Sequence, residues 1–203
     1  MRIINCEQYS PEWWAERLAH PTSSQYSKIV TSKGEPSKQR TAYMHELAAE
    51  RLTGKQEDTF ISIAMQKGSE RESLSRQVYE MENEVEVVQV GLCISDCGRW
   101  GASPDGLVGD DGLVELKNPL GKTQVERLLT LEPKLPTAYI QQVQGQLLVT
   151  GRLWCDFVSY VPGLPLFTLR VYRDSIFCDK LEAALIEFCE ELDEVCAELT
   201  LTV

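Results

Sequence analysis

Hydrophobic and polar residues alternate at helical spacing over the N-terminal part of the chain. Ser10 followed by Pro11 is typical of a helix start, because serine caps free backbone N–H groups and proline suits the first turn. A strong helix is expected over residues 37–54, with Ser37 as its cap and Gly54 as its end. Further helices are expected to begin near residues 22–24 and to run over residues 62–83.

From residue 84 onward the spacing changes to that of strands. Residues 84–95 alternate and are rich in valine, which predicts a strand. Residues 99–118 predict two strands that fold back on each other through an Asp-Asp-Gly turn. The remaining pattern predicts a helix over residues 136–151, strands over residues 153–161 and 166–172, and a long amphipathic helix over residues 174–199.

Together these elements predict one α/β domain over residues 1–203, with a central mixed β-sheet flanked by helices. There is no internal repeat, low-complexity tract or obvious linker, and 203 residues suffice to bury a substantial core. Within this domain we expect a mostly helical part (1–83), a sheet core (84–173) and an acidic C-terminal helix (174–199).

The formal net charge of −11 argues mildly against nucleic acid as a partner. The charge is uneven, however: residues 174–203 hold nine acidic residues and one lysine, whereas residues 1–71 hold ten basic and nine acidic residues. A local basic surface in the N-terminal third could contact phosphates while the acidic helix faces solvent. Because no secretory signal or membrane-spanning stretch is recognisable, we expect a cytoplasmic protein with no membrane partner.

The seven cysteines form no Cys-x-x-Cys pair and are irregularly spaced. In a reducing compartment they are expected to behave as small buried apolar residues. Cys178, Cys189 and Cys196 are separated by 11 and 7 residues, which predicts one face of a helix packed in the core. An iron–sulfur cluster is the alternative.

The segment SPDGLVGDDGLVELKNP carries the most specific chemistry. Residues two apart on a strand share a face, so Glu115 and Lys117 point the same way while Leu116 points into the core. Folding the hairpin back through its turn brings Asp105 beside that pair. The competing interpretation is a plain hairpin with an acidic turn and a surface Glu–Lys pair.

Two carboxylates and an ammonium group suit metal-assisted phosphodiester hydrolysis. Carboxylate oxygens are hard ligands for Mg²⁺, and the backbone carbonyl of Leu116 lies between two of the candidate ligands. Lys117 can orient or help to deprotonate an attacking water and can stabilise charge on the phosphate. Mn²⁺ is expected to substitute for Mg²⁺.

Five sequence blocks extend this site along most of residues 12–151: EWWAERLAHPTSS, AMQKGSERE, ASPDGL, VELKNP and AYIQQVQGQLLVTG. In this order they resemble the lambda exonuclease family of phage recombination nucleases (YqaJ-like), within the PD-(D/E)xK nuclease superfamily. The resemblance implies a restriction-endonuclease-like nuclease fold. The C-terminal strand pair and helix match that family only in outline.

The resemblance implies catalytic roles for Asp105, Glu115 and Lys117, with the Leu116 carbonyl as a further metal ligand. Glu72 matches a helix-borne acid near a second metal, so two Mg²⁺ ions are expected. Without the family match, Glu72 would be interpreted as a solvated helix glutamate. Asp96 matches a further acidic residue only if a small gap is allowed in the alignment.

The resemblance also implies a pocket for the 5′-terminal phosphate, formed by Arg17, Ser24, Ser103 and Gln142. A guanidinium can bind phosphate through two parallel hydrogen bonds, and hydroxyl and amide groups add further ones. Taken singly, Ser24 could be a helix cap and Gln142 an exposed helix residue. Tyr139 is expected to pack near this group.

Further DNA contacts are expected from an aromatic residue and from basic residues. Trp13, or the adjacent Trp14, matches an aromatic near the unpaired end of the duplex, where an exposed indole would stack on a base. Core packing is the competing interpretation of this Trp pair. A polar connection between helices is expected to contain Lys33, Lys38 and Arg40. These residues could contact duplex phosphates, and a mobile solvated loop is the competing interpretation.

These observations predict a Mg²⁺-dependent exodeoxyribonuclease that degrades the 5′-ended strand of double-stranded DNA. The resemblance alone implies the 5′→3′ direction, a ring-shaped homotrimer, a phage or prophage origin and a single-strand annealing protein as recombination partner. The nearer rival is an end-independent endonuclease or repair nuclease of the same superfamily. The more distant rival is a non-catalytic DNA-binding assembly module.

Overall fold

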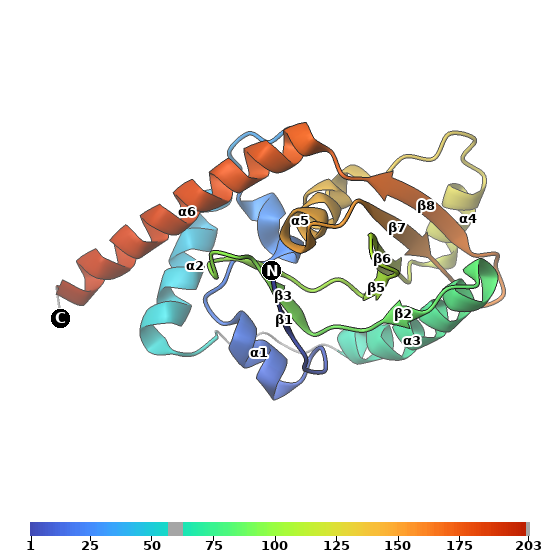
Figure 1. Ribbon diagram of the computed structural model, residues 1–203, viewed down its shortest axis with the longest axis horizontal. Coiled ribbons are helices and arrows are strands. Elements are labelled where there is room, and N and C mark those ends of the chain that lie inside the picture. The colour runs from blue at the N-terminus through green and yellow to red at the C-terminus, as the bar shows by residue number, and fades with distance from the viewer. Residues whose placement is uncertain (57–62, 202–203) are drawn as a thin grey trace.

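Two β-sheets lie at the centre of the protein, and helices pack around them (Figure 1). The computed structural model describes residues 1–56 and 63–201, with no description of the side chains of residues 63–70. The larger sheet has the strand order β2-β5-β6-β7-β8. Its strands are β2 (Val87–Val88), β5 (Gly106–Val108), β6 (Gly112–Lys117), β7 (Trp154–Ser159) and β8 (Phe167–Tyr172).

The larger sheet is mixed, because β6 and β7 run parallel while the other neighbours are antiparallel. A smaller antiparallel sheet has the order β1-β3-β4, formed by β1 (Arg2–Ile4), β3 (Leu92–Ile94) and β4 (Gly101–Ala102). The predicted α/β class, with a mixed sheet flanked by helices, is confirmed.

Two helical layers enclose the larger sheet. α3 (Ile63–Asn83) packs against β6 and β7, and α5 (Ile140–Thr150) packs against β7 and the smaller sheet. α6 (Ser175–Leu201) lies over α5 and α2 (Figure 1). The remaining helical elements are α1 (Pro11–Arg17), the 3-10 helix η1 (Ser23–Lys28), α2 (Arg40–Thr53), α4 (Gly121–Leu128) and the 3-10 helix η2 (Thr137–Tyr139).

The helix ends agree with the sequence prediction in two places and differ from it in one. Ser10 caps α1, since its Oγ accepts a hydrogen bond from the Trp13 N–H at 3.2 Å. Gly54 ends α2 in the left-handed conformation, with φ 66°. The prediction of Ser37 as a helix cap is wrong, because its Oγ accepts from the Gln39 N–H in a turn that precedes α2. The helix expected near residues 22–24 is the 3-10 helix η1.

The strand expected over residues 84–95 is divided between the two sheets. β2 joins the larger sheet and β3 joins the smaller one, with Gly91 between them. A Cβ at Gly91 would come within 2.5 Å of the Cys6 carbonyl oxygen, so only glycine allows the chain to cross here. The sequence prediction also missed β1 and α4, which are too short for a clear periodic pattern.

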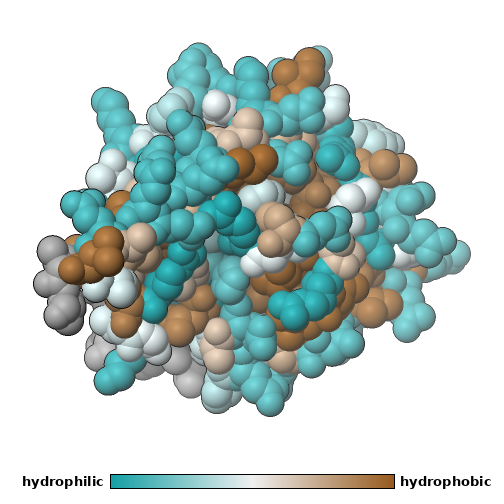
Figure 2. Space-filling model, turned by 60° about the vertical axis from the view of Figure 1, so that its left-hand side comes forward, coloured by the Kyte–Doolittle hydropathy of each residue, from teal (hydrophilic) through white to brown (hydrophobic). Residues whose placement is uncertain are grey.

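The face of α6 that carries Cys178, Cys189 and Cys196 is buried against the core, as the cysteine spacing predicts. The opposite face is acidic and exposed. The space-filling view shows that hydrophilic residues cover most of the visible surface, with hydrophobic residues between them (Figure 2). No helix among the described residues is long and apolar enough to cross a membrane.

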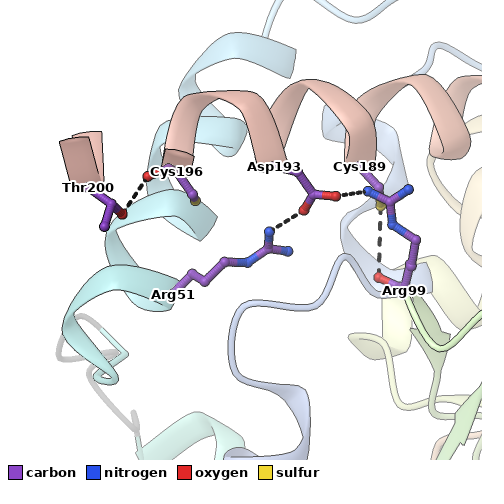
Figure 3. A network of polar contacts seen from close by, with 6 residues as sticks. All are labelled: Arg51, Arg99, Cys189, Asp193, Cys196 and Thr200. Atoms are coloured by element: carbon purple, nitrogen blue, oxygen red, sulfur yellow. Dashed lines mark hydrogen bonds and ion pairs between the residues drawn. The ribbon is translucent and has the colours of Figure 1, made fainter. Parts of the chain in front are cut away.

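Ion pairs fasten α6 to the rest of the protein. Asp193 binds Arg51 of α2 through one carboxylate oxygen and Arg99, in the connection between β3 and β4, through the other (Figure 3). The Cys189 thiol adds a contact of 3.8 Å to the Arg99 carbonyl oxygen. Part of the acidity of α6 is therefore compensated within the chain.

Candidate active site

The β5–β6 hairpin positions the predicted carboxylates. The Arg152 guanidinium donates to the carbonyl oxygens of Gly109 and Gly112, each at 2.7 Å, and so fixes the turn. Asp105 immediately precedes β5, and its Oδ2 accepts a hydrogen bond of 2.6 Å from the Leu116 N–H. The hairpin therefore brings Asp105 beside β6, as the sequence predicts.

Glu115 is the most strongly held side chain of the site. It is only 1% exposed, and each of its carboxylate oxygens accepts hydrogen bonds. Oε1 accepts from Gln142 at 2.6 Å and from the Lys117 ammonium, while Oε2 accepts from Gln146 at 2.6 Å. Because Gln142 and Gln146 are four residues apart on α5, both amides reach the same carboxylate.

Glu72 reaches the same site from α3. Burial raises its pKa, and the nearby Glu115 raises it further. Burial likewise raises the pKa of Asp105 well above its usual range, with Glu115 and Glu72 adding to the effect. Three carboxylates thus act on one another, although the positive charges of Arg76 and Lys117 lower the pKa of Glu72, and Glu72 is more than a solvated helix glutamate.

The donor set fits a hard divalent cation, since carboxylate oxygens are the ligands that Mg²⁺ prefers. In the present side-chain orientations, the described part of the chain has no group of three His, Cys, Asp or Glu residues placed to bind one metal ion. Asp105 is turned toward the Leu116 N–H and Glu115 toward its three donors. Binding of a cation would therefore require these carboxylates to exchange donors.

Lys117 is held as an ammonium group. Burial alone would lower its pKa, but Glu115 and Asp105 outweigh burial and raise the pKa above its ordinary value. The Tyr139 ring lies below it, with Nζ 5.2 Å from the ring centroid, and Tyr139 in turn packs on Phe157. A lysine in this state orients water and stabilises negative charge more readily than it accepts a proton.

Arg17 forms a second polar centre with three hydroxyl groups. Its guanidinium donates to Thr22 at 2.8 Å, to Ser103 at 3.1 Å and to Ser24 at 3.4 Å. Burial lowers its pKa to about 10, so that the group stays positive at neutral pH. None of the ion pairs among the described residues involves Arg17.

A single cavity of about 390 Å³ joins the two centres. Such a volume lies in the range of small-ligand sites. Lining residues include Arg17, Ser24 and Ser103 at one centre and Glu72, Asp105 and Glu115 at the other. The structure thus brings together three of the four residues predicted for the phosphate pocket. The fourth, Gln142, lines the cavity but is bonded to Glu115.

Trp13 does not present the exposed indole that base stacking requires. It is 4% exposed, packs with Leu92 and Ile94, and donates from Nε1 to Gly91 and Ser103. The core interpretation of Trp13 is therefore correct, and its ring supports the Arg17 guanidinium at 4.1 Å.

The basic residues predicted to contact DNA are in different environments. Lys33 and Lys38 are exposed in the connection before α2. The prediction that Arg40 belongs to this connection is wrong: it begins α2 and binds Glu191 of α6 with both terminal nitrogens. Asp96 is also separate from the carboxylates, because it pairs with the N-terminal amine at an exposed position.

Tyr9, Thr22 and Gln146 are among the residues of the cavity region that were not predicted. The spacing of Gln142 and Gln146 on one helix is the only sequence signal that could have indicated one of them. Thr22 is buried beside Arg17, and Tyr9 comes from the turn before α1.

Comparisons with known proteins agree with this geometry. The profile of the YqaJ-like viral recombinase domain matches residues 12–153. An alkaline exonuclease from Laribacter hongkongensis (LHK-Exo) is 40% identical, with 95% of this chain and 97% of that chain covered and a TM-score of 0.84. Its complex with dAMP matches at 39% identity, with the same TM-score of 0.84 and the same coverage of 95% and 97%.

A more distant solved structure shares the fold. A phage-related exonuclease from Haemophilus somnus 129PT is 15% identical, covers 89% of this chain and 96% of its own, and has a TM-score of 0.68. No curated protein sequence matches the chain. The solved relatives are thus exonucleases, and the more similar of them extends over nearly the whole chain.

Proposed function

The chain belongs to the YqaJ-like viral recombinase domain family and is an exonuclease-type hydrolase, and from this premise we propose that it degrades the 5′-ended strand of duplex DNA. The products would be 5′-mononucleotides, a class to which the dAMP bound by the Laribacter relative belongs. The observation that supports the proposal most strongly is a cavity with a carboxylate cluster at one centre and an arginine that donates to three hydroxyl groups at the other.

We propose that Asp105, Glu115 and the Leu116 carbonyl hold one Mg²⁺ ion, with Glu72 near a second. When bound, the metal would polarise the phosphate and lower the pKa of water. The buried carboxylates supply the hard oxygen ligands, and their mutual repulsion favours uptake of a cation. Mn²⁺ would substitute, since the same oxygen ligands suit it.

The other residues of the site would position the reacting groups. The Lys117 ammonium lies against Glu115 and can hold the attacking water or the phosphate oxygen on which charge develops. Gln142 and Gln146 fix the orientation of Glu115 through one hydrogen bond to each oxygen. We therefore propose that Gln142 acts on Glu115 and contacts the 5′-phosphate only after release from it.

Gln146→Leu is expected to weaken Mg²⁺ affinity about 10–100-fold, because it removes the donor that orients the Glu115 Oε2 oxygen. Isothermal titration of the protein with Mg²⁺ or Mn²⁺ measures this without reference to cleavage. Gln141→Leu is the matched control: Gln141 lies on the same helix and is also buried, but it donates to the Val30 carbonyl. Equal metal affinity in both variants would remove Gln146 from the proposed role.

We propose that Arg17, with Ser24 and Ser103, binds the 5′-terminal phosphate of the strand being degraded. A partly buried guanidinium surrounded by hydroxyl acceptors retains its charge and can exchange hydroxyls for phosphate oxygens. Because this centre lines the same cavity as the carboxylates, a terminal phosphate bound there would leave the next linkage near the cluster.

Arg17→Ala is expected to reduce the preference for 5′-phosphorylated over 5′-hydroxyl ends about tenfold or more, since charged hydrogen bonds to phosphate are lost. The comparison is the ratio of initial rates on the two duplexes. Arg17→Lys, which keeps a positive charge without the forked geometry, should retain part of the preference. If Arg17→Ala had the same ratio of initial rates as the wild type, the 5′-phosphate would be bound by other residues.

End dependence separates the proposed exonuclease from an endonuclease or repair nuclease. Linear duplexes labelled at either end, with and without a 5′-phosphate, would be digested beside covalently closed circles. We expect early release of the 5′ label as mononucleotide and no cleavage of circles. Cleavage of closed circles at a comparable rate would favour the endonuclease, and no cleavage of any substrate in Mg²⁺ would favour a non-catalytic DNA-binding module.

We further propose a ring-shaped homotrimer, a phage or prophage origin and a single-strand annealing protein as partner. A ring would let a chain of net charge −11 hold DNA, because only the residues lining its channel need to be basic. The viral recombinase family supports the recombination role. Sedimentation equilibrium tests the trimer directly.

A further inference from the structure

Tyr9 has a backbone conformation that tyrosine rarely adopts. Its φ is +68°, and it is the third residue of a turn closed by the Ser10 N–H donating to the Glu7 carbonyl oxygen at 3.2 Å. A glycine or asparagine is favoured at such a position because a Cβ clashes there. Retention of a large side chain at a strained position points to a role for that side chain.

Neighbouring contacts hold the turn in this conformation. The Gln8 side-chain amide donates to the carbonyl oxygens of Val90 and Pro104, each at 2.9 Å. Pro104 directly precedes Asp105, so the turn is fastened to the segment that carries a proposed metal ligand. On the other side, Ser10 caps α1, which leads to Arg17.

The Tyr9 ring lines the cavity that joins the two polar centres. Its centroid is 5.1 Å from that of Trp13, whose ring supports the Arg17 guanidinium. Burial raises the pKa of Tyr9 to about 12, and the charges of Glu72 and Asp105 add to this effect. The residue remains 47% exposed and lines the cavity, so one side of it is open.

We propose that Tyr9 packs on the sugar and base of the 5′-terminal nucleotide, between the phosphate bound at Arg17 and the linkage cleaved at the carboxylate cluster. This inference rests on the proposed 5′→3′ exonuclease function and names the residue that contacts the nucleoside itself. An aromatic ring suits a nuclease of broad sequence range, because every base has a face on which it can stack. Trp13 is buried beneath this ring and cannot take the same place.

Variants at Tyr9 separate a contact with the nucleotide from a structural role. Tyr9→Asn removes the ring but suits a positive φ, and Tyr9→Phe keeps the ring without the hydroxyl. Tyr9→Asn should keep or raise the melting temperature, since it relieves strain, yet lower kcat/KM on 5′-phosphorylated duplex about fivefold or more. Tyr9→Phe should stay within about twofold of the wild type, as expected for a stacking contact.

A second comparison tests whether Tyr9 contacts the base of the 5′-terminal nucleotide. The duplexes carry either a normal 5′-terminal nucleotide or an abasic one that keeps the phosphate. Loss of the base should slow the wild type and Tyr9→Phe, but have little further effect on Tyr9→Asn, because the contact is already absent. An equal abasic penalty in wild type and Tyr9→Asn would overturn the proposal. A wild type without 5′-end-dependent cleavage would instead overturn the function on which it rests.

Discussion

Asp105→Asn is expected to lower DNA cleavage at least about 10³-fold and, at the same time, to raise the thermal stability of the metal-free protein at alkaline pH. Loss of cleavage follows from removal of a charged metal ligand. The gain in stability follows from the charge balance, because Asp105 is buried near Glu115 and Glu72, and both raise its pKa together with burial. Asparagine keeps the oxygen that accepts from the Leu116 N–H.

The sign of the pH dependence follows from linkage. A carboxyl group whose pKa is raised on folding binds its proton more tightly in the native than in the unfolded state. Its contribution to the free energy of unfolding is therefore most favourable at low pH and is lost as pH rises through the raised pKa. The advantage of Asp105→Asn over the wild type should accordingly grow as pH rises from the ordinary carboxyl range through the raised pKa of Asp105.

Calorimetry in EDTA at several pH values measures this effect. In a chain of this size, each kcal/mol in the free energy of unfolding shifts the melting temperature by about 2–4 °C. Mg²⁺ should raise the melting temperature of the wild type more than that of the variant, because the variant lacks one charged ligand and binds the ion more weakly. Asp110→Asn is the matched control, being the same change at an exposed position of the hairpin turn. A less stable Asp105→Asn protein would contradict the assigned charge balance.

Local pattern was enough to predict the carboxylate cluster. The two-residue period of a strand fixes the common face of Glu115 and Lys117, and the turn fixes the return of Asp105. Glu72, in contrast, lies far away in sequence, and its position was predicted only from the family resemblance. Both predictions concern where the backbone places a residue. A short segment is enough to predict this for the hairpin, and an alignment is enough for Glu72.

The misjudged residues depend on tertiary contacts that no periodic pattern contains. Arg40 was expected in a polar connection that contacts DNA, although the helix predicted over residues 37–54 contains it, and its partner Glu191 lies 151 residues later. For Trp13 the pattern left base stacking and core packing open, and the smaller sheet, which includes the missed strand β1, covers it. Gln146 looks like any buried helix residue until α5 is placed beside β6 and its amide meets Glu115.

Lys117→Ala is expected to reduce turnover about 10²–10⁴-fold while leaving Mg²⁺ and DNA affinity intact. The ammonium group touches Glu115 but is not a metal ligand, so its loss removes stabilisation of the reacting groups and not the cation. Single-turnover rates at saturating Mg²⁺ test the loss of turnover, and titration with Mg²⁺ tests the unchanged metal affinity. The exposed Lys122 provides the control, as Lys122→Ala should cleave normally. A Lys117→Ala enzyme with near-normal turnover would remove Lys117 from the mechanism.

The same variant should differ from Asp105→Asn in stability. Removing the Lys117 ammonium leaves the buried Glu115 carboxylate with only its two amide donors, so the metal-free protein should lose about 1–3 kcal/mol. Added Mg²⁺ should stabilise Lys117→Ala by about as much as the wild type, because the metal affinity is unchanged. Two variants that both abolish cleavage would thus shift metal-free stability in opposite directions. A common shift in both would show that general misfolding, and not the charge balance of the carboxylate cluster, explains the loss of activity.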